Sequence, residues 1–158
     1  NVQRTANSCV VQSNYVVAKA IVQQLRWLAM TPRILIADDD EGLRHLLQLV
    51  LRHEGFEVIE AADGIEALAR AYDSNPTLVL LDVMMPGVDG YDVCRKLRSD
   101  QRTHRMPIVF VTAIDDITQR NESLKLGADD CIKKPIGPRE LIARVREVLD
   151  RRGLAWAA

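Results

Sequence analysis

Long apolar runs are missing from this 158-residue chain, as is any large excess of charge. No uninterrupted apolar stretch approaches the about 18 residues of a membrane-spanning helix. The formal net charge is −1, from 21 basic and 22 acidic residues, and neither a basic stripe nor a helix-turn-helix pattern is present. We therefore expect no direct contact with nucleic acid and no membrane partner.

Cysteine is also scarce. The three cysteines, Cys9, Cys94 and Cys131, are an odd number, lie far apart, and include no Cys-x-x-Cys pair. This spacing is typical neither of a disulfide framework nor of a zinc site. It favours a reducing compartment, so we expect a cytoplasmic protein.

The first 30 residues differ from the rest of the chain. Residues 9–29 are largely apolar, but polar side chains interrupt them and no clear cleavage site follows, so they make a poor signal peptide. We interpret residues 1–30 as an N-terminal extension that can be helical. It is a helix that pairs with another chain, a remnant of a preceding region, or sequence added in cloning. We expect the folded domain at 31–153 and a short tail at 154–158.

From residue 33 onward, short apolar runs alternate with helical patterns. Three of the runs are continuously apolar, as in a parallel sheet covered on both faces, whereas the alternating run at 56–59 indicates a strand near an edge. Five strand-then-helix units predict a doubly wound α/β domain with right-handed crossovers. Strands are predicted at 34–37, 56–59, 78–81, 108–111 and 131–132, and helices near 43–51, 65–72, 91–99, 118–126 and 141–149.

Polar side chains follow four of the predicted strands. Residues 38–40 are three aspartates after the first strand, and Asp82 follows the third strand. Thr112 and Lys134 follow the fourth and fifth strands. An aspartate in such a place can be a helix cap or part of a solvated turn. In an open parallel sheet, however, ligands bind beyond the carboxyl ends of the strands, so the whole set predicts a functional site.

This set of residues is typical of phosphoryl chemistry. Clustered carboxylates favour a hard cation such as Mg²⁺, and a carboxylate can be a nucleophile toward a phosphoryl group. The oxygens of a transferred phosphoryl group carry negative charge, which a cation, a lysine and a hydroxyl can stabilise.

Four segments together resemble the receiver domain of two-component response regulators: ILIADDDEGLRHLL, LVLLDVMMPGVDG, IVFVTA and GADDCIKKPI. The resemblance covers about residues 33–152. It implies a flavodoxin-like (βα)5 fold with a five-stranded parallel sheet in strand order 2-1-3-4-5. It also implies a signalling protein, not an enzyme, which receives a phosphoryl group from a histidine kinase or a phosphotransfer protein.

The resemblance assigns a role to each site residue. It makes Asp82 the phosphoacceptor, with Thr112 and Lys134 acting on the phosphoryl group, and it places a cis peptide before Pro135. Asp40 is interpreted as a helix cap rather than a ligand. The residues that would hold Mg²⁺, directly, through water or by a main-chain carbonyl, are Asp38, Asp39, Asp82 and Met84.

The chain departs from the family pattern at Cys131, where receivers of this type carry a Tyr or Phe that turns inward during the switch. A degenerate receiver that serves as an interaction scaffold is therefore an alternative. An aspartyl-phosphate phosphohydrolase is another, but it would need an acid in place of Met84. In receivers, the positions of Met84 and Ile114 flank the path of the hydrolysing water. Because both are apolar here, we predict slow self-dephosphorylation.

Charged residues on the fourth predicted helix, just before the fifth strand and on the last helix resemble the dimer face of winged-helix DNA-binding response regulators. A solvated surface is the alternative, because exposed ion pairs contribute only ~0–1 kcal/mol each. We expect this face to switch on phosphorylation for dimerisation or partner binding. Its residues are Arg120, Asp129, Asp130, Glu140, Arg144 and Arg151.

Overall fold

The computed structural model describes residues 17–18, 21, 31–113 and 117–154. Apart from the last two residues, the chain divides into two compact units, residues 1–31 and residues 32–156. In the first unit, the described residues Val17, Ala18 and Ile21 are helical. The second unit contains the sheet.

Five strands alternate with five helices in the described part of the second unit. None of the described helices is both long and apolar enough to cross a membrane. The helices predicted fourth and fifth along this unit are α5 and α6. The strands are β1 (Arg33–Ala37), β2 (Glu57–Ala61), β3 (Leu78–Leu81), β4 (Ile108–Thr112) and β5 (Asp130–Lys133). The helices are α2 (Glu41–His53), α3 (Gly64–Ser74), α4 (Gly90–Ser99), α5 (Ile117–Lys125) and α6 (Pro138–Arg151).

All five strands are parallel, in the order β2-β1-β3-β4-β5. The predicted doubly wound, flavodoxin-like fold and its strand order are confirmed, as is the place of β2 at an edge. The order reverses between β1 and β3, because β1 pairs with β2 on one side and with β3 on the other. This reversal is where ligands bind in open α/β sheets.

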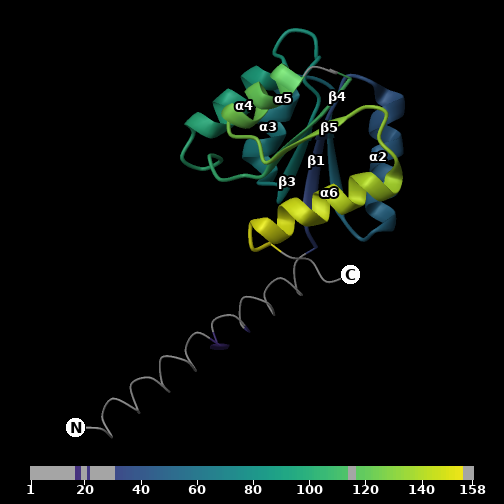
Figure 1. The fold of residues 1–158 in the computed structure, drawn as a ribbon, viewed down its shortest axis with the longest axis vertical. Coiled ribbons are helices and arrows are strands. Elements are labelled where there is room, and N and C mark those ends of the chain that lie inside the picture. The colour runs from purple at the N-terminus through teal and green to yellow at the C-terminus, as the bar shows by residue number, and fades with distance from the viewer. Residues whose placement is uncertain (1–16, 19–20, 22–30, 114–116, 155–158) are drawn as a thin grey trace, which may run out of the picture. The chain divides into compact units, whose positions relative to one another are not determined.

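Helices cover both faces of the sheet (Figure 1). On β1, Ile34 and Ile36 pack into one core with α2 and α6, while Leu35 and Ala37 pack into the other core with α3 and α4. Every residue of β3 and β4 is buried. That double burial explains why these two strands read as continuous apolar runs, since both faces lie against helices.

Aspartate caps begin three of the helices at the ends of the strand-to-helix loops. The side chain of Asp40 accepts a hydrogen bond from the backbone N–H of Leu43 (3.0 Å) and so caps α2. Asp63 and Asp89 cap α3 and α4 in the same way. The cap role expected for Asp40 is confirmed, and it fixes the turn after β1 against the start of α2.

Candidate functional site

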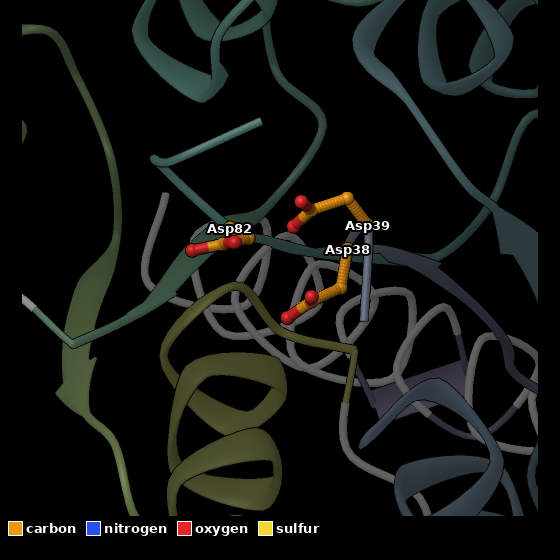
Figure 2. Close-up of side chains that lie close together, drawn as sticks. All are labelled: Asp38, Asp39 and Asp82. Atoms are coloured by element: carbon orange, nitrogen blue, oxygen red, sulfur yellow. The ribbon is translucent and has the colours of Figure 1, made fainter. Parts of the chain in front are cut away.

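Three carboxylates meet where β1 and β3 end. Asp38 and Asp39 directly follow β1, and Asp82 directly follows its neighbour β3. The backbone N–H of Asp82 donates to the carbonyl oxygen of Ala37 (2.8 Å), which holds the two strand ends together. Oxygens of the three carboxylates lie within 4.8 Å of one another. Figure 2 shows Asp38 and Asp39 on one segment, with the carboxylate of Asp39 directed toward Asp82.

The cluster is mostly buried and faces one ammonium group. Asp38 is 2% exposed and Asp82 is 4% exposed, whereas Asp39 lies at the surface. Lys134 places its Nζ 2.6 Å from Asp38 Oδ2 and 3.4 Å from Asp82 Oδ2. Three carboxylates beside one ammonium leave an excess of negative charge. Oxygen donors with excess negative charge fit a hard divalent cation such as Mg²⁺.

The pKa values of the buried groups follow from this arrangement. Burial raises the pKa of Asp82, and the charge of Asp38 raises it further, while Lys134 only partly opposes the shift. Burial alone would lower the pKa of Lys134, but its hydrogen bond to Asp38 and the charge of Asp82 outweigh that effect and raise it. Lys134 is therefore held as a cation, and it only partly compensates the buried charge of Asp82.

The end of β4 positions the lysine. Thr112 is the last residue of β4 and is 3% exposed. Its carbonyl oxygen accepts a hydrogen bond from the backbone N–H of Lys134 (2.8 Å), just beyond the end of β5. The peptide bond between Lys134 and Pro135 is cis, as the resemblance implied. The structure thus brings the backbones of Thr112 and Lys134 together at the strand ends.

The loop after β3 shapes the other side of the cluster. The backbone N–H of Met84 donates to Asp82 Oδ1 (3.3 Å), and the Met84 side chain is 66% exposed. A Cβ atom added to Gly90, the first residue of α4, would lie 2.1 Å from the carbonyl oxygen of Asp82. Only a glycine allows α4 to begin this close to the Asp82 backbone.

Sequence reasoning missed two residues at this site. Besides Gly90, it did not single out Arg44 on α2, whose Nη1 donates to the carbonyl oxygen of Asp38 (2.7 Å). Both residues act on main-chain atoms, so no spacing of reactive side chains marked them. The pair Asp89-Gly90 at the start of a predicted helix was the nearest available signal for the glycine.

The predicted switch and lifetime residues lie in different settings. Cys131 is half-buried on β5, in register with Phe110 of β4, and packs against the core that includes α3 and α4. Ile114 lies outside the described residues. Arg120 belongs to α5, but its side chain is outside the described set.

Residues of the predicted dimer face form contacts within the chain. Arg144 Nη1 lies 3.2 Å from Asp130 Oδ2, and Arg151 Nη2 donates to the carbonyl oxygen of Asp129 (3.3 Å). Glu140 is exposed in the first turn of α6. These residues belong to β5, the turn before it and α6, and none of them is part of the acidic cluster.

Comparisons with known proteins agree with the geometry. The family model of the response regulator receiver domain matches residues 34–146. The DNA-binding response regulator MtrA of Mycobacterium tuberculosis is 48% identical over 122 residues, which are 77% of this chain and 52% of that protein. The probable transcriptional regulator ycf27 of Galdieria sulphuraria is 47% identical over 119 residues, or 75% of this chain and 46% of that protein. A crystal structure of a putative response regulator from Chloroflexus aurantiacus superposes with a TM-score of 0.74 at 40% identity and covers 77% of this chain and 100% of that chain.

The curated relatives correct one expectation from the sequence. The chain spans about half the length of these relatives. The expectation of no direct contact with nucleic acid is wrong, because MtrA is named a DNA-binding response regulator. That expectation relied on the near-neutral charge of this chain and on its lack of a basic stripe and of a helix-turn-helix pattern. Such features of a chain that spans about half of its relatives do not report on the partners of the whole relatives.

Proposed function

Since this chain belongs to the response regulator receiver domain family of two-component signalling, we propose that Asp82 accepts a phosphoryl group from a histidine kinase or a phosphotransfer protein. One observation carries the proposal. The Asp82 carboxylate is buried beside both a cation, Lys134 Nζ at 3.4 Å, and two further carboxylates. A structural ion pair would need only one carboxylate. The surplus acids favour a site that receives additional positive charge.

Each side chain of the site has a separate role in the phosphoryl transfer. An oxygen of Asp82 attacks the phosphorus of a phosphohistidine, so an O–P bond forms while the N–P bond of the donor breaks. The departing imidazole takes up a proton. The raised pKa of Asp82 makes its ionised carboxylate more basic, and Lys134 next to it stabilises the charge of the incoming oxygens. The Thr112 hydroxyl would donate to one of those oxygens.

Asp38, Asp39, Asp82 and the carbonyl oxygen of Met84 would hold Mg²⁺. When bound, the ion would supply positive charge to the oxygens of the transferred group. The contribution of the chain itself is the surplus of carboxylates, two of which are already desolvated.

Phosphoryl uptake from acetyl phosphate tests the assignment. With Mg²⁺ present, we expect the wild type to take up one phosphoryl group, and the Asp82→Asn variant to take up none, because an amide is not a comparable nucleophile. The matched control is Asp40→Asn, since asparagine also caps helices and Asp40 caps α2. Equal labelling of Asp82→Asn and the wild type would refute the assignment.

We also propose a long lifetime for the phosphorylated state. Met84 presents an exposed thioether side chain next to Asp82, and a thioether cannot orient a water molecule as an amide or acid can. Isolated phosphoprotein should lose its label slowly, and Met84→Asn should lose it faster. A rapid loss from the wild type would contradict this part of the proposal.

The output we propose is control of DNA binding by a longer protein, by analogy with the named activity of MtrA. The face formed by α5, β5 and α6 would switch between contacts within the chain, such as Arg144 with Asp130, and contacts with a second copy. Sedimentation with and without beryllofluoride tests this dimerisation. An unchanged mass over a wide concentration range would exclude it.

A further inference from the structure

We propose that Arg44 is a positioning residue for the acidic site, because its guanidinium fixes the turn that carries Asp38 and Asp39. This inference rests on the proposed function, since it states that the affinity of the site for Mg²⁺ depends on Arg44.

Arg44 ties the turn after β1 to α2 through both its side chain and its backbone. Its Nη1 donates to the carbonyl oxygen of Asp38 (2.7 Å), and its backbone N–H donates to the carbonyl oxygen of Asp40 (2.9 Å). The residue is half-buried one turn into the helix. Arg44 therefore joins the first and the last residue of the turn to one rigid element.

Asp38 is held on every side by these contacts. Its backbone N–H donates to Ala61 O on β2 (3.2 Å). Its Oδ1 accepts from the backbone N–H of Asp40 (2.9 Å), and its Oδ2 accepts from Lys134 Nζ (2.6 Å). The Arg44 contact holds the carbonyl of the peptide that links Asp38 to Asp39. Rotation of that peptide would move both carboxylates relative to Asp82.

A residue of this kind acts on a metal site through the ligands. Partners that orient ligands typically change metal affinity by roughly 10–100-fold when they are removed. The charge of Arg44 has the opposite effect on the affinity for Mg²⁺. Arg44 is a cation near a cation site, so loss of its charge alone would raise the affinity for Mg²⁺. The direction of the change therefore separates positioning from simple electrostatics.

The test is a calorimetric titration with Mg²⁺ alone of the wild type, Arg44→Ala, Arg44→Lys and Arg52→Ala. Arg52 is exposed on the same helix, so its removal changes the net charge equally without touching the turn. We expect about tenfold weaker binding for Arg44→Ala, partial recovery for Arg44→Lys, which keeps a donor and a charge, and no weakening for Arg52→Ala. Circular dichroism of each variant checks the fold.

A second measurement separates positioning from general damage. At saturating Mg²⁺, acetyl phosphate should still label Arg44→Ala, because the substitution leaves the phosphoacceptor Asp82 in place. Equal or tighter Mg²⁺ binding by Arg44→Ala, or loss of labelling at saturating Mg²⁺, would overturn this inference while leaving the proposed function intact. If Arg44→Ala does not fold, Arg44→Lys decides, and wild-type affinity in that variant would overturn the need for a guanidinium. A wild type that binds no Mg²⁺ would overturn the proposed function itself.

Discussion

At the scale of single residues, the burial of the Asp82 carboxylate and the charges beside it make the free energy of unfolding depend on pH. Burial is the main reason that its pKa lies above the ordinary value, the charge of Asp38 adds to the shift, and Lys134 only partly offsets it. A group whose pKa is higher in the folded than in the unfolded state favours folding at low pH. That contribution is fully present below the unfolded pKa and is lost as the pH rises through the folded pKa.

Asp82→Asn should therefore stabilise the metal-free protein at neutral pH. We expect the free energy of unfolding at pH 7 to rise, because burial and the charge of Asp38 raise the pKa of Asp82 and the uncharged amide avoids the cost of a buried charge. The gain should shrink toward pH 4, where the wild-type carboxyl becomes protonated. Urea unfolding in the presence of EDTA at both pH values measures it. A variant less stable than the wild type at pH 7 would show that the pair with Lys134 outweighs the burial of Asp82.

The charged side chains of the site were easier to predict from the sequence than the residues that position them. Asp38, Asp82 and Lys134 each follow a strand, and the ends of parallel strands lie along one edge of the sheet, so their proximity could be predicted. Arg44 and Gly90 could not be identified in this way. Each is defined by its distance to a main-chain oxygen, 2.7 Å from Arg44 Nη1 and 2.1 Å from an added Cβ at Gly90, and such distances exist only after folding.

At the scale of elements, Arg98 fastens the end of α4 to two neighbouring loops. Its Nε donates to Gly127 O (2.9 Å), its Nη1 to Met106 O (2.8 Å), and its Nη2 to Asp129 Oδ2 (3.4 Å). The arginine side chain is only 17% exposed. Main-chain carbonyls that lose a buried donor remain desolvated, which makes such contacts costly to remove.

Arg98→Ala should lower the free energy of unfolding by about 2–3 kcal/mol, since it removes three hydrogen bonds and leaves a largely buried Asp129 with less compensation. Arg95→Ala is the matched control on the same helix, because Arg95 pairs with Asp92 (2.7 Å) at the solvent-exposed surface. We expect that control to unfold as the wild type does in urea. Equal losses in the two variants would mean that the contacts of Arg98 contribute no more than a surface pair.

The type and order of the helices and strands could be predicted from the sequence, but their first and last residues could be predicted less well. The last helix was predicted near 141–149 and is Pro138–Arg151. An apolar stripe reports only the buried face, and the first three residues of this helix are exposed. The strand predicted at 131–132 begins at Asp130. That residue is buried although it is polar, so hydrophobicity alone could not include it.

At the scale of the whole molecule, Mg²⁺ binding should stabilise the fold. A ligand that binds only the folded state at 100 times its Kd adds about 2.7 kcal/mol to the free energy of unfolding. Asp39→Asn should reduce this gain with little effect on the metal-free protein, because Asp39 is exposed. Thermal unfolding with Mg²⁺ and with EDTA measures the difference. Asp40→Asn is the control and should keep the full gain, so an equal gain in Asp39→Asn would remove Asp39 from the ligand set.

Two features of the whole molecule, the strand order and the partners, could not be predicted from the pattern of residues alone. Periodicity predicted a doubly wound sheet, but the strand order came from the resemblance to receivers, because the spacing of strands along a chain does not say which strands pair. The expectation of no direct contact with nucleic acid, which used the charge balance of this chain, was wrong. Fold and site are properties of the chain itself, whereas a fold does not by itself identify the partners.

The carboxylate of Asp129 contacts three elements near the end of α6. Asp129 Oδ1 accepts from Arg152 Nε (2.6 Å), its Oδ2 accepts from Ile108 N at the start of β4 (2.9 Å), and Arg98 of α4 lies beside it. A pull on the chain at Arg152 would therefore be resisted by α4 and β4 before α6 could peel from the sheet. Asp129 thus couples the residue after α6 to α4 and to the start of β4, so the loss of this one carboxylate would release all three contacts together.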